Sequence, residues 1–438
     1  MTLQRLFAEA IGHHRSGALA EAARRYRAVL AGEPAVAAVQ GNLAGALRDQ
    51  GRLDEAASLF RRALRLQPQE PALHLGRGTL LHYAADPLGA AESVRRAILL
   101  APGSADACSN LGGSLQQAGD LAGAEAAYRK ALRLDPDFAE ARFNLSLLLL
   151  LTGRLEEGWP GYEERWRTRQ LSAERREFPQ PQWRGEAAAG KTLLLHAEQG
   201  FGDTIQFSRY AALAADRGLR VIMEVQPALL RLLRATPGCE RVIGRGEELP
   251  AFDLHCPMMS MPLAVGPRIP PMPRLDIDAA ESPGASRKIG LVWAGAPRRD
   301  SPEKSAFDRR RSLPPERLAP LLALPGLRFF SLQKGGPPIP EGLPIADPME
   351  GVEDFADTAA LIQGLDLVIS VDTAVAHLAA ALGKPVWLLN RFDSDWRWGA
   401  KGERCAWYPS VRIFRQPAPG DWDGVVASVL SAAGAVAG

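Results

Sequence analysis

Residues 369–389 read ISVDTAVAHLAAALGKPVWLL, and this stretch indicates a strand, a short polar turn, a helix of small residues and a second strand. The apolar runs at its two ends have the length and composition of buried strands. Asp372 or Thr373 is placed to cap the helix, and the GKP tripeptide at 383–385 ends it. A strand, a helix and a second strand in this order predict a parallel α/β sheet.

Three polar side chains of this stretch are candidates for binding an anion. Asp372 and Thr373 lie at the predicted helix start, and His377 returns to the same face about one turn later. In open α/β sheets, a helix N-terminus at the carboxyl end of a parallel strand binds phosphate and similar anions. The stretch therefore predicts either a nucleotide-sugar pocket or an ordinary βαβ turn, with Asp372 as a cap and His377 on the surface.

The composition is that of a globular protein with an extensive core. The 438 residues are 46% hydrophobic and 23% charged, which is enough for two or three domains. The net charge of +2 gives no indication of nucleic-acid or membrane binding. The four cysteines are far apart in the sequence: Cys108, Cys239, Cys256 and Cys405. This spacing argues against a zinc site or a disulfide framework and fits a reducing compartment.

The sequence contains no recognisable targeting or membrane segment. The N-terminal MTLQRLFAEAIGHHRSG lacks the apolar core of a signal peptide. The longest apolar run, residues 147–151, is too short to span a bilayer. We therefore expect a cytoplasmic protein without stable membrane insertion.

A period of 34 residues runs through the N-terminal third. Prolines recur at this period at Pro34, Pro68, Pro102 and Pro136, and apolar or aromatic residues recur at Tyr26, Phe60, Val94, Tyr128 and Tyr162. Alanines recur at Ala22, Ala56, Ala90 and Ala124, and turn glycines recur at Gly17, Gly51, Gly119 and Gly153, with Ala85 in place of the missing glycine. This pattern resembles the tetratricopeptide repeat.

The resemblance implies a superhelix of about five helix–turn–helix units in residues 1–170. The units are expected to start near Leu3, Ala37, Pro71, Ala105 and Ala139, and Gly158-Trp159-Pro160 is expected to interrupt the last helix. Such arrays present a concave face to a peptide or protein partner. Asn42, Asn110 and Asn144 recur on the first helices and are placed to bond an extended acceptor peptide. The alternatives are a spacer or dimerisation scaffold, with these asparagines exposed and idle.

The rest of the chain alternates short apolar strands with helices, which predicts two parallel, Rossmann-like sheets. We place a linker at 171–190, a first half at 191–265, a Pro-rich linker at 266–287 and a second half at 288–438.

In the first half, a strand at 192–196 is followed by AEQGFGDT and a helix from Ile205. Gly200 and Gly202 allow backbone conformations that are closed to other residues. They do not form a dinucleotide-binding motif, because no third glycine follows at the required spacing. Asp203 is either a helix cap or a general base over a cleft between the halves.

In the second half, polar and basic residues follow the strands. Ala294-Gly295 follows the strand at 288–293, and Gln333-Lys334 follows the strand at 327–332. A basic loop is expected to contain Arg298, Arg299, Lys304, Arg309, Arg310 and Arg311. Basic side chains at strand ends suit a phosphate or diphosphate, and Arg311 and Lys334 are the preferred candidates. The alternative for any of these arginines is a solvated loop.

The motifs GFGDTIQFSRY, WAGAP, RRRSL, SLQKG and DTAVAHLAAALGKPVW, in this order, resemble the heptosyltransferase-type glycosyltransferases. This resemblance implies a GT-B fold of two Rossmann-like halves. The C-terminal DWRW and WYPS segments resemble the branch that carries tetratricopeptide repeats, some members of which modify flagellin with a nonulosonic acid. The layout is also similar to the O-linked N-acetylglucosamine transferases.

The resemblance also implies roles for individual residues. Asp203 would be the base that deprotonates the acceptor hydroxyl, and the second half would bind the nucleotide-sugar. The residues implied for donor or substrate binding are Gly200, Gly202, Trp293, Ala294, Gly295, Arg311, Gln333, Lys334, Asp372, Thr373 and His377.

We therefore expect an inverting glycosyltransferase that transfers a sugar to Ser or Thr of a protein held by the repeats. Its co-substrate would be a nucleotide-sugar, CMP-linked for a nonulosonic acid, with no bound cofactor. Asp393-Ser-Asp395 spells a metal-binding DxD motif, but a helix dipole and basic side chains replace the metal in enzymes of this type. The alternatives are a non-catalytic scaffold with a ligand-binding domain, and a transferase that acts on a glycan or lipid-linked acceptor.

Overall fold

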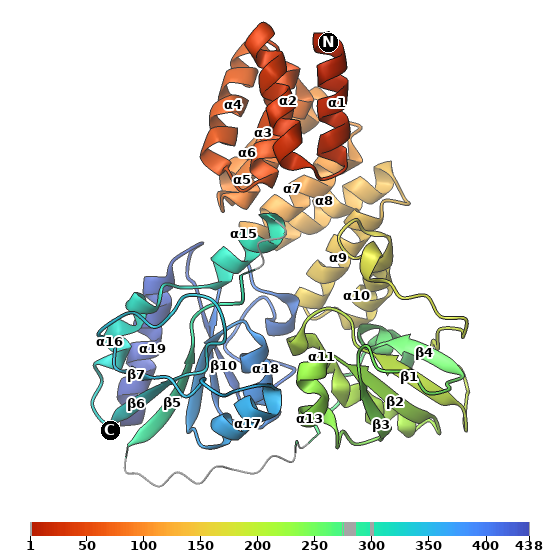
Figure 1. Ribbon diagram of the computed structural model, residues 1–438, viewed down its shortest axis with the longest axis vertical. Coiled ribbons are helices and arrows are strands. Elements are labelled where there is room, and N and C mark those ends of the chain that lie inside the picture. The colour runs from red at the N-terminus through yellow and green to blue at the C-terminus, as the bar shows by residue number, and fades with distance from the viewer. Residues whose placement is uncertain (1, 274, 276–285, 298–301, 438) are drawn as a thin grey trace. The chain divides into compact units, whose positions relative to one another are not determined.

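The computed structural model describes residues 2–273, 275, 286–297 and 302–437. Its elements confirm the predicted fold class, because a helical array is followed by two parallel α/β sheets (Figure 1). The chain divides into two compact units. Residues 1–145 and most of helix α15 (Pro302–Arg311) form the first, and residues 146–297 with 311–438 form the second.

The repeat helices begin where the 34-residue period predicts. They are α1 (Leu3–Arg15), α2 (Leu19–Gly32), α3 (Ala37–Asp49), α4 (Leu53–Leu66), α5 (Pro71–Tyr83), α6 (Pro87–Leu100), α7 (Ala105–Gln117), α8 (Leu121–Leu134), α9 (Ala139–Leu151) and α10 (Leu155–Tyr162). The first helix of each unit starts at residue 3, 37, 71, 105 or 139, which confirms the predicted period.

Small residues make room for larger ones between the paired helices. The periodic alanines Ala22, Ala56, Ala90 and Ala124 are completely buried, and the aromatic or apolar residues of the second helices are buried beside them. At Gly112 on α7, a Cβ atom would lie 2.5 Å from the ring of Tyr128 on α8. The glycine is therefore needed for close packing of this helix pair.

Ala85 occupies a turn position that favours glycine. It has a φ of 61°, and the glycines at the same position of other units have φ values from 78° to 85°: Gly17, Gly51, Gly119 and Gly153. The left-handed region destabilises an L-residue by about 1 kcal/mol. We expect Ala85→Gly to raise the midpoint of urea unfolding followed by far-UV circular dichroism. The control Ala84→Gly should give no gain, because Ala84 has a φ of −79°. A midpoint for Ala85→Gly at or below the wild-type value contradicts the assignment.

The second unit contains two sheets in which the paired strands are parallel. The first sheet has the order β3-β2-β1-β4, with β1 (Thr192–His196), β2 (Arg220–Val225), β3 (Cys239–Gly244) and β4 (Leu254–Pro257). The second has the order β10-β9-β8-β5-β6-β7, with β5 (Arg287–Val292), β6 (Leu327–Ser331), β7 (Ile345–Ala346), β8 (Leu367–Val371), β9 (Val386–Asn390) and β10 (Val411–Arg415). The chain order reverses between β1 and β4 and between β5 and β8. Open α/β sheets bind ligands at such reversal points, outside the carboxyl ends of the strands.

After the repeat helices, the α-helices of the second unit range from four residues in α13 and α16 to 16 residues in α19. They are α11 (Phe201–Phe207), α12 (Ala211–Ala215), α13 (Leu230–Leu233), α14 (Met261–Val265), α16 (Ala319–Leu322), α17 (Phe355–Gln363), α18 (Ala374–Ala381) and α19 (Trp422–Ala437). The predicted strand–helix–strand stretch is confirmed as β8, α18 and β9, and the strands are buried throughout. Figure 1 shows α17, α18 and α19 beside the second sheet.

Three local predictions were wrong, and two of them concern helix bounds. The interruption predicted at Gly158-Trp159-Pro160 lies slightly later in the chain, because α10 continues through Pro160 and ends at Tyr162, where a 3-10 helix (Glu163–Arg167) follows. The helix expected from Ile205 already begins at Phe201, where Gly200 caps it.

The third concerns the predicted basic loop, which is partly a helix, α15. Pro302 suits the first turn of a helix, and most of the residues that follow it are good helix formers. Arg298 and Arg299 lie outside the described residues, as does part of the predicted linker at 266–287.

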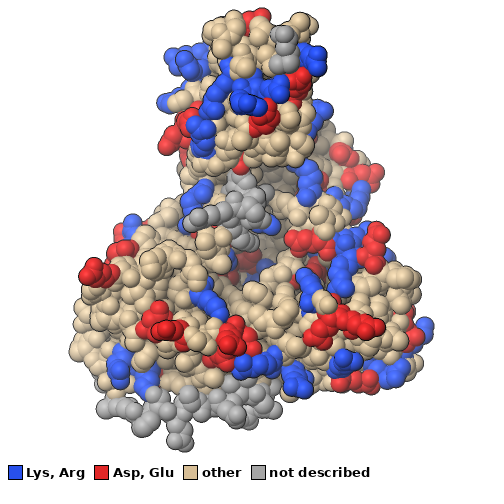
Figure 2. All heavy atoms as spheres, viewed as in Figure 1, with Lys and Arg blue, Asp and Glu red and all other residues tan. Residues whose placement is uncertain are grey.

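Charge and hydropathy give no additional fold signal. On the face shown in Figure 2, basic and acidic side chains are intermixed, in keeping with the net charge of +2. Within the described ranges, none of the helices combines the length and hydrophobicity that a bilayer crossing requires.

Candidate functional site

The predicted site residues follow the carboxyl ends of parallel strands. The loop after β1 leads to Asp203, the loop after β5 contains Trp293 to Gly295, β6 leads to Gln333, and β8 leads to Asp372. This is the edge at which α/β sheets bind ligands. The topology therefore brings the sequence candidates of each sheet to one edge of that sheet.

Asp203 is the third residue of α11 and contributes to its N-terminus. Its Oδ2 atom accepts a hydrogen bond of 2.9 Å from the backbone N–H of Gly200, so Gly200 is the cap and Asp203 its partner. Its Oδ1 atom accepts a hydrogen bond from the guanidinium of Arg397. The Asp203 side chain is 17% exposed and therefore accessible. It serves the helix start and also lies at a charged site.

Arg397 connects two carboxylates. Besides its ion pair with Asp203, its Nη1 atom lies 2.9 Å from Oδ1 of Asp395. Burial works against its charged form, but the two carboxylates raise the pKa of Arg397 above its usual value. Burial likewise opposes ionisation of Asp395, and Arg397 nevertheless lowers the pKa of that carboxyl. Both acidic groups of the DxD motif are paired with arginines, since Asp393 lies 3.5 Å from Arg391.

His377 is buried beside Gly202. It is 4% exposed, its Nδ1 atom lies 3.1 Å from the hydroxyl of Tyr408, and its ring centroid lies 4.8 Å from that of Trp398. A Cβ atom on Gly202 would lie 2.7 Å from the imidazole, so the glycine permits α11 and α18 to pack closely here. The alternative that His377 is a surface residue is wrong.

The pKa of His377 predicts a pH dependence of stability. Burial and the charge of Arg397 lower this pKa from 6.5 to about 3. Between these values the unfolded chain takes up a proton that the folded chain does not, so stability falls as the pH falls. We expect the melting temperature to decrease between about pH 7 and pH 5, and to decrease less in His377→Gln. Burial also lowers the pKa of His196, so part of the slope should remain. An identical slope in the variant contradicts this account.

Arg311, Gly295 and Asp372 come together at the reversal point of the second sheet. Nη1 of Arg311 donates a hydrogen bond of 2.9 Å to the backbone oxygen of Asp372. A Cβ atom on Gly295 would overlap the Arg311 guanidinium, so the glycine makes room for this side chain. Burial and the neighbouring charge of Asp395 raise the pKa of the Asp372 carboxyl. A cation and a polar helix start therefore lie between the ends of β5 and β8.

Gln333 holds the loop after β5. Its Oε1 atom accepts a hydrogen bond of 3.0 Å from the N–H of Ala294, and its Nε2 atom donates one of 3.0 Å to the oxygen of Ala294. The side chain of Trp293 is completely buried and donates to the oxygen of Pro337. Trp293 was predicted to belong to the donor-binding loop, but its side chain is part of the core.

Two other donor-side candidates have different surroundings. Thr373 is the N-cap residue of α18, and its hydroxyl lies 3.0 Å from that of Ser370. The ammonium group of Lys334 donates to the backbone oxygen of Val352 at 2.6 Å. Lys334 therefore ties the loop after β6 to the segment before α17.

The three periodic asparagines lie on first helices of their repeats. Asn110 on α7 is exposed, and Asn42 on α3 and Asn144 on α9 are partly exposed. Their amides are accessible from solvent, and their role in a peptide groove stays a prediction.

Sequence reasoning noted the C-terminal aromatic segments as a resemblance but missed Arg397 and Tyr408 as residues of the site. Arg397 lies between two tryptophans of DWRW, and Tyr408 belongs to WYPS. Buried Arg209 also donates a hydrogen bond of 3.0 Å to the oxygen of Trp407 and lies over the ring of Tyr408. An arginine enclosed by tryptophans was the available signal, because charges in an aromatic segment require partners when buried.

In the part of the chain that the structure describes, no group of three or more His, Cys, Asp or Glu side chains has the arrangement of a metal site.

Comparison with known families finds matches in two parts of the chain. Residues 7–71, 75–137 and 109–170 match the tetratricopeptide repeat family. Residues 351–415 match glycosyltransferase family 9 (heptosyltransferase). The chain combines tetratricopeptide repeats with a heptosyltransferase-like domain. The second match contains Asp372, Thr373, His377 and Arg397, whereas Asp203 lies outside it.

Individual proteins are similar over parts of the chain. Protein FlbA of Caulobacter vibrioides is 29% identical over 328 residues, which are 65% of this chain and 53% of that protein. The chain therefore spans about half the length of this relative. Among solved structures, a thermophilic TPR protein of Thermus thermophilus is 18% identical, with a TM-score of 0.36, over 39% of this chain and 94% of that one. MamA of Desulfovibrio magneticus is 19% identical, with a TM-score of 0.33, over 40% and 97%.

Proposed function

We propose that this chain transfers a sugar from a nucleotide-sugar to Ser or Thr of a protein acceptor. The heptosyltransferase-like match supports sugar transfer, and the repeats support a protein partner. The observation that carries the proposal is the meeting of α11 with the C-terminal loops. Asp203 pairs with Arg397, and Gly202 lies against His377. An accessible carboxylate from the first sheet thus adjoins residues of the transferase-like segment.

In the proposed reaction, the acceptor hydroxyl oxygen attacks the anomeric carbon as Asp203 accepts its proton. The bond between that carbon and the nucleotide phosphate oxygen breaks in the same step, and the nucleotide leaves as an anion. One displacement inverts the configuration. Arg311 and the N-terminus of α18 are the groups that would offset the charge of the leaving phosphate, without a metal ion.

We further propose a CMP-linked nonulosonic acid as the donor and a flagellin-like protein as the acceptor. The C-terminal DWRW and WYPS segments carry this part of the proposal, because they resemble the repeat-containing branch of these transferases. The acceptor would bind along the face that contains Asn42, Asn110 and Asn144.

The test of donor binding is thermal stabilisation of the full chain by CMP, UDP, GDP and ADP. A ligand at about 100 times its Kd stabilises the folded state by about 2.7 kcal/mol. We expect selective stabilisation by CMP, reduced in Arg311→Met and retained in the control Asn42→Ala. Stabilisation by UDP alone would replace the nonulosonic acid by an N-acetylhexosamine. No shift with any nucleotide or its sugar conjugate contradicts a donor site and favours a scaffold.

A further inference from the structure

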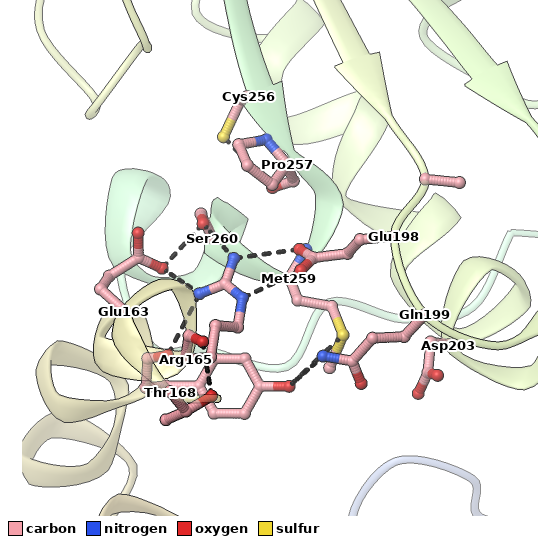
Figure 3. Close-up of polar contacts among 12 residues, drawn as sticks. Glu163, Arg165, Thr168, Glu198, Gln199, Asp203, Cys256, Pro257, Met259 and Ser260 are labelled. Atoms are coloured by element: carbon pink, nitrogen blue, oxygen red, sulfur yellow. Dashed lines mark hydrogen bonds and ion pairs between the residues drawn. The ribbon is translucent and has the colours of Figure 1, made fainter. Parts of the chain in front are cut away.

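Arg165 is completely buried in the short 3-10 helix that follows the last repeat helix, residues 163–167. Its Nε and Nη2 atoms donate to the two carboxylate oxygens of Glu198 at 2.9 and 3.0 Å. Nη2 also donates to the hydroxyl of Ser260 at 2.7 Å, and Nη1 donates to Glu163 at 2.6 Å. Figure 3 shows the guanidinium enclosed by these three partners. The charge is therefore fully compensated in a fixed orientation.

Glu198 connects this arginine to the reversal point of the first sheet. It lies two residues after β1, and its Oε1 atom accepts a hydrogen bond of 3.0 Å from the N–H of Met259, just after β4. The loops after β1 and β4 are thus joined through one carboxylate. Arg165 holds that carboxylate by both oxygens, so the start of the loop that leads to Asp203 is fixed by the segment after the repeats.

Tyr162 makes a second connection, one residue further along the same loop. Its hydroxyl accepts a hydrogen bond of 3.1 Å from Nε2 of Gln199. Gln199 has a φ of 53°, a conformation uncommon for residues other than glycine. Its backbone oxygen also accepts a bond of 3.2 Å from Gln226. Contacts from two separate segments therefore support an unfavourable backbone conformation directly before Gly200.

The same loop is bonded to the side chain of Asp203. Gly200 follows Gln199, and the N–H of Gly200 donates to the carboxylate of Asp203 at 2.9 Å. Figure 3 shows Glu198, Gln199 and Asp203 in succession along the loop. Arg165 therefore holds Glu198, and Tyr162 holds Gln199. The hydrogen bond between Gly200 and Asp203 then connects these two loop residues to the proposed base.

We propose that Tyr162 and Arg165 are positioning residues that orient Asp203 for proton transfer. This inference rests on the proposed function of Asp203. It gives the end of the repeat array a part in the transfer step, in addition to any part in acceptor binding. Both residues belong to the same compact unit as the loop that they hold.

The test variant is Tyr162→Phe, which keeps the buried ring and removes the hydroxyl, with its bond from Gln199 and its weaker contact of 3.5 Å to the sulfur of Met259. The matched control is Tyr128→Phe, at the same position of the preceding repeat, where the hydroxyl donates to Gln116 at 3.2 Å instead. The measurements are the rate of label transfer from saturating CMP-linked nonulosonic acid, the Kd for CMP and the melting temperature. A misplacement of about 1 Å reduces an oriented reaction by up to about 100-fold. We expect Tyr162→Phe to lower the rate at least about tenfold, with the Kd for CMP changed less than about twofold.

Arg165→Lys is a conservative comparison, because lysine keeps the charge but cannot make the bidentate hydrogen bonds to both oxygens of Glu198. We expect its rate to lie below the wild-type rate, with CMP binding retained. A wild-type rate in Tyr162→Phe overturns the proposal. So does a loss of rate that is matched by equal losses in CMP affinity and melting temperature, because that pattern indicates a purely structural role.

Asp203→Asn in the same assay distinguishes a failure of the positioning role from a failure of the proposed function of Asp203. If Asp203→Asn is inactive while Tyr162→Phe is fully active, only the positioning role is wrong. If Asp203→Asn transfers at the wild-type rate, the proposed function of Asp203 fails, and the positioning role fails with it.

Discussion

Replacing Asp203 by Asn should lower the rate of sugar transfer by a factor of about 10² to 10⁴ while leaving nucleotide binding nearly intact. Asn has the shape of Asp and retains an oxygen that accepts the helix-start bond from Gly200. It cannot take up the proton of an acceptor hydroxyl at neutral pH. Arg397 keeps Asp395 at 2.9 Å as its second carboxylate partner, so the C-terminal loop should stay in place.

The rate is measured as label transferred from the nucleotide-sugar to protein, and nucleotide binding is measured by calorimetry. The matched control is Asp216→Asn, at an exposed aspartate just after α12, which should transfer at the wild-type rate. Unchanged transfer by Asp203→Asn removes Asp203 as the base. A parallel loss of nucleotide affinity would instead make Asp203 a binding residue.

Replacing Arg165 by Met should destabilise the second unit by about 3–5 kcal/mol. The side chain is completely buried, and its removal leaves Glu198 as a buried carboxylate without a cation. Burial already raises the pKa of Glu198, and Arg165 opposes this rise. The double variant Arg165→Met/Glu198→Gln should recover much of the loss, because both charges then disappear together.

Urea unfolding of the wild type, the two single variants and the double variant forms a double-mutant cycle. The control is Arg167→Met, two residues further along. Arg167 is 52% exposed and pairs with Glu164 on the surface, so its loss should change stability by less than about 1 kcal/mol. A similar small effect for Arg165→Met, or additive effects in the cycle, contradicts a coupled buried ion pair.

The repeat array was predictable because its signals are local. Each turn glycine and each buried alanine determines structure within its own helix pair, and the 34-residue spacing therefore placed every first helix correctly. The exception was α10, which continues through Pro160 to Tyr162 and whose buried Trp159 packs against Phe207 and Trp396 from distant segments. Burial of a side chain by distant residues is not visible in a local pattern.

The edge that carries the candidate site was also predictable. Parallel strands bring their carboxyl ends together, so Asp372 and Gly295 could be assigned to one edge from the predicted alternation of strands and helices. Burial of His377 was not predicted, because it depends on Tyr408 and Trp398, from a different part of the sequence.

The ion pairs of the site were beyond sequence reasoning. Arg397 and Asp203 are 194 positions apart, and Arg165 and Glu198 lie on opposite sides of a predicted linker. Each of these residues has an ordinary alternative as a solvated charge. Only the fold shows which of the 52 lysines and arginines are buried beside a carboxylate.

Transfer of labelled sugar to protein tests the central claim most directly. The full chain is incubated with a labelled nucleotide-sugar and a protein extract from the cells that make it, and label in protein is then measured. Our account predicts incorporation from the donor whose nucleotide stabilises the chain, CMP in the first instance, and its loss in Asp203→Asn. No incorporation from CMP-, UDP-, GDP- or ADP-linked sugars, or equal incorporation by Asp203→Asn, would contradict it.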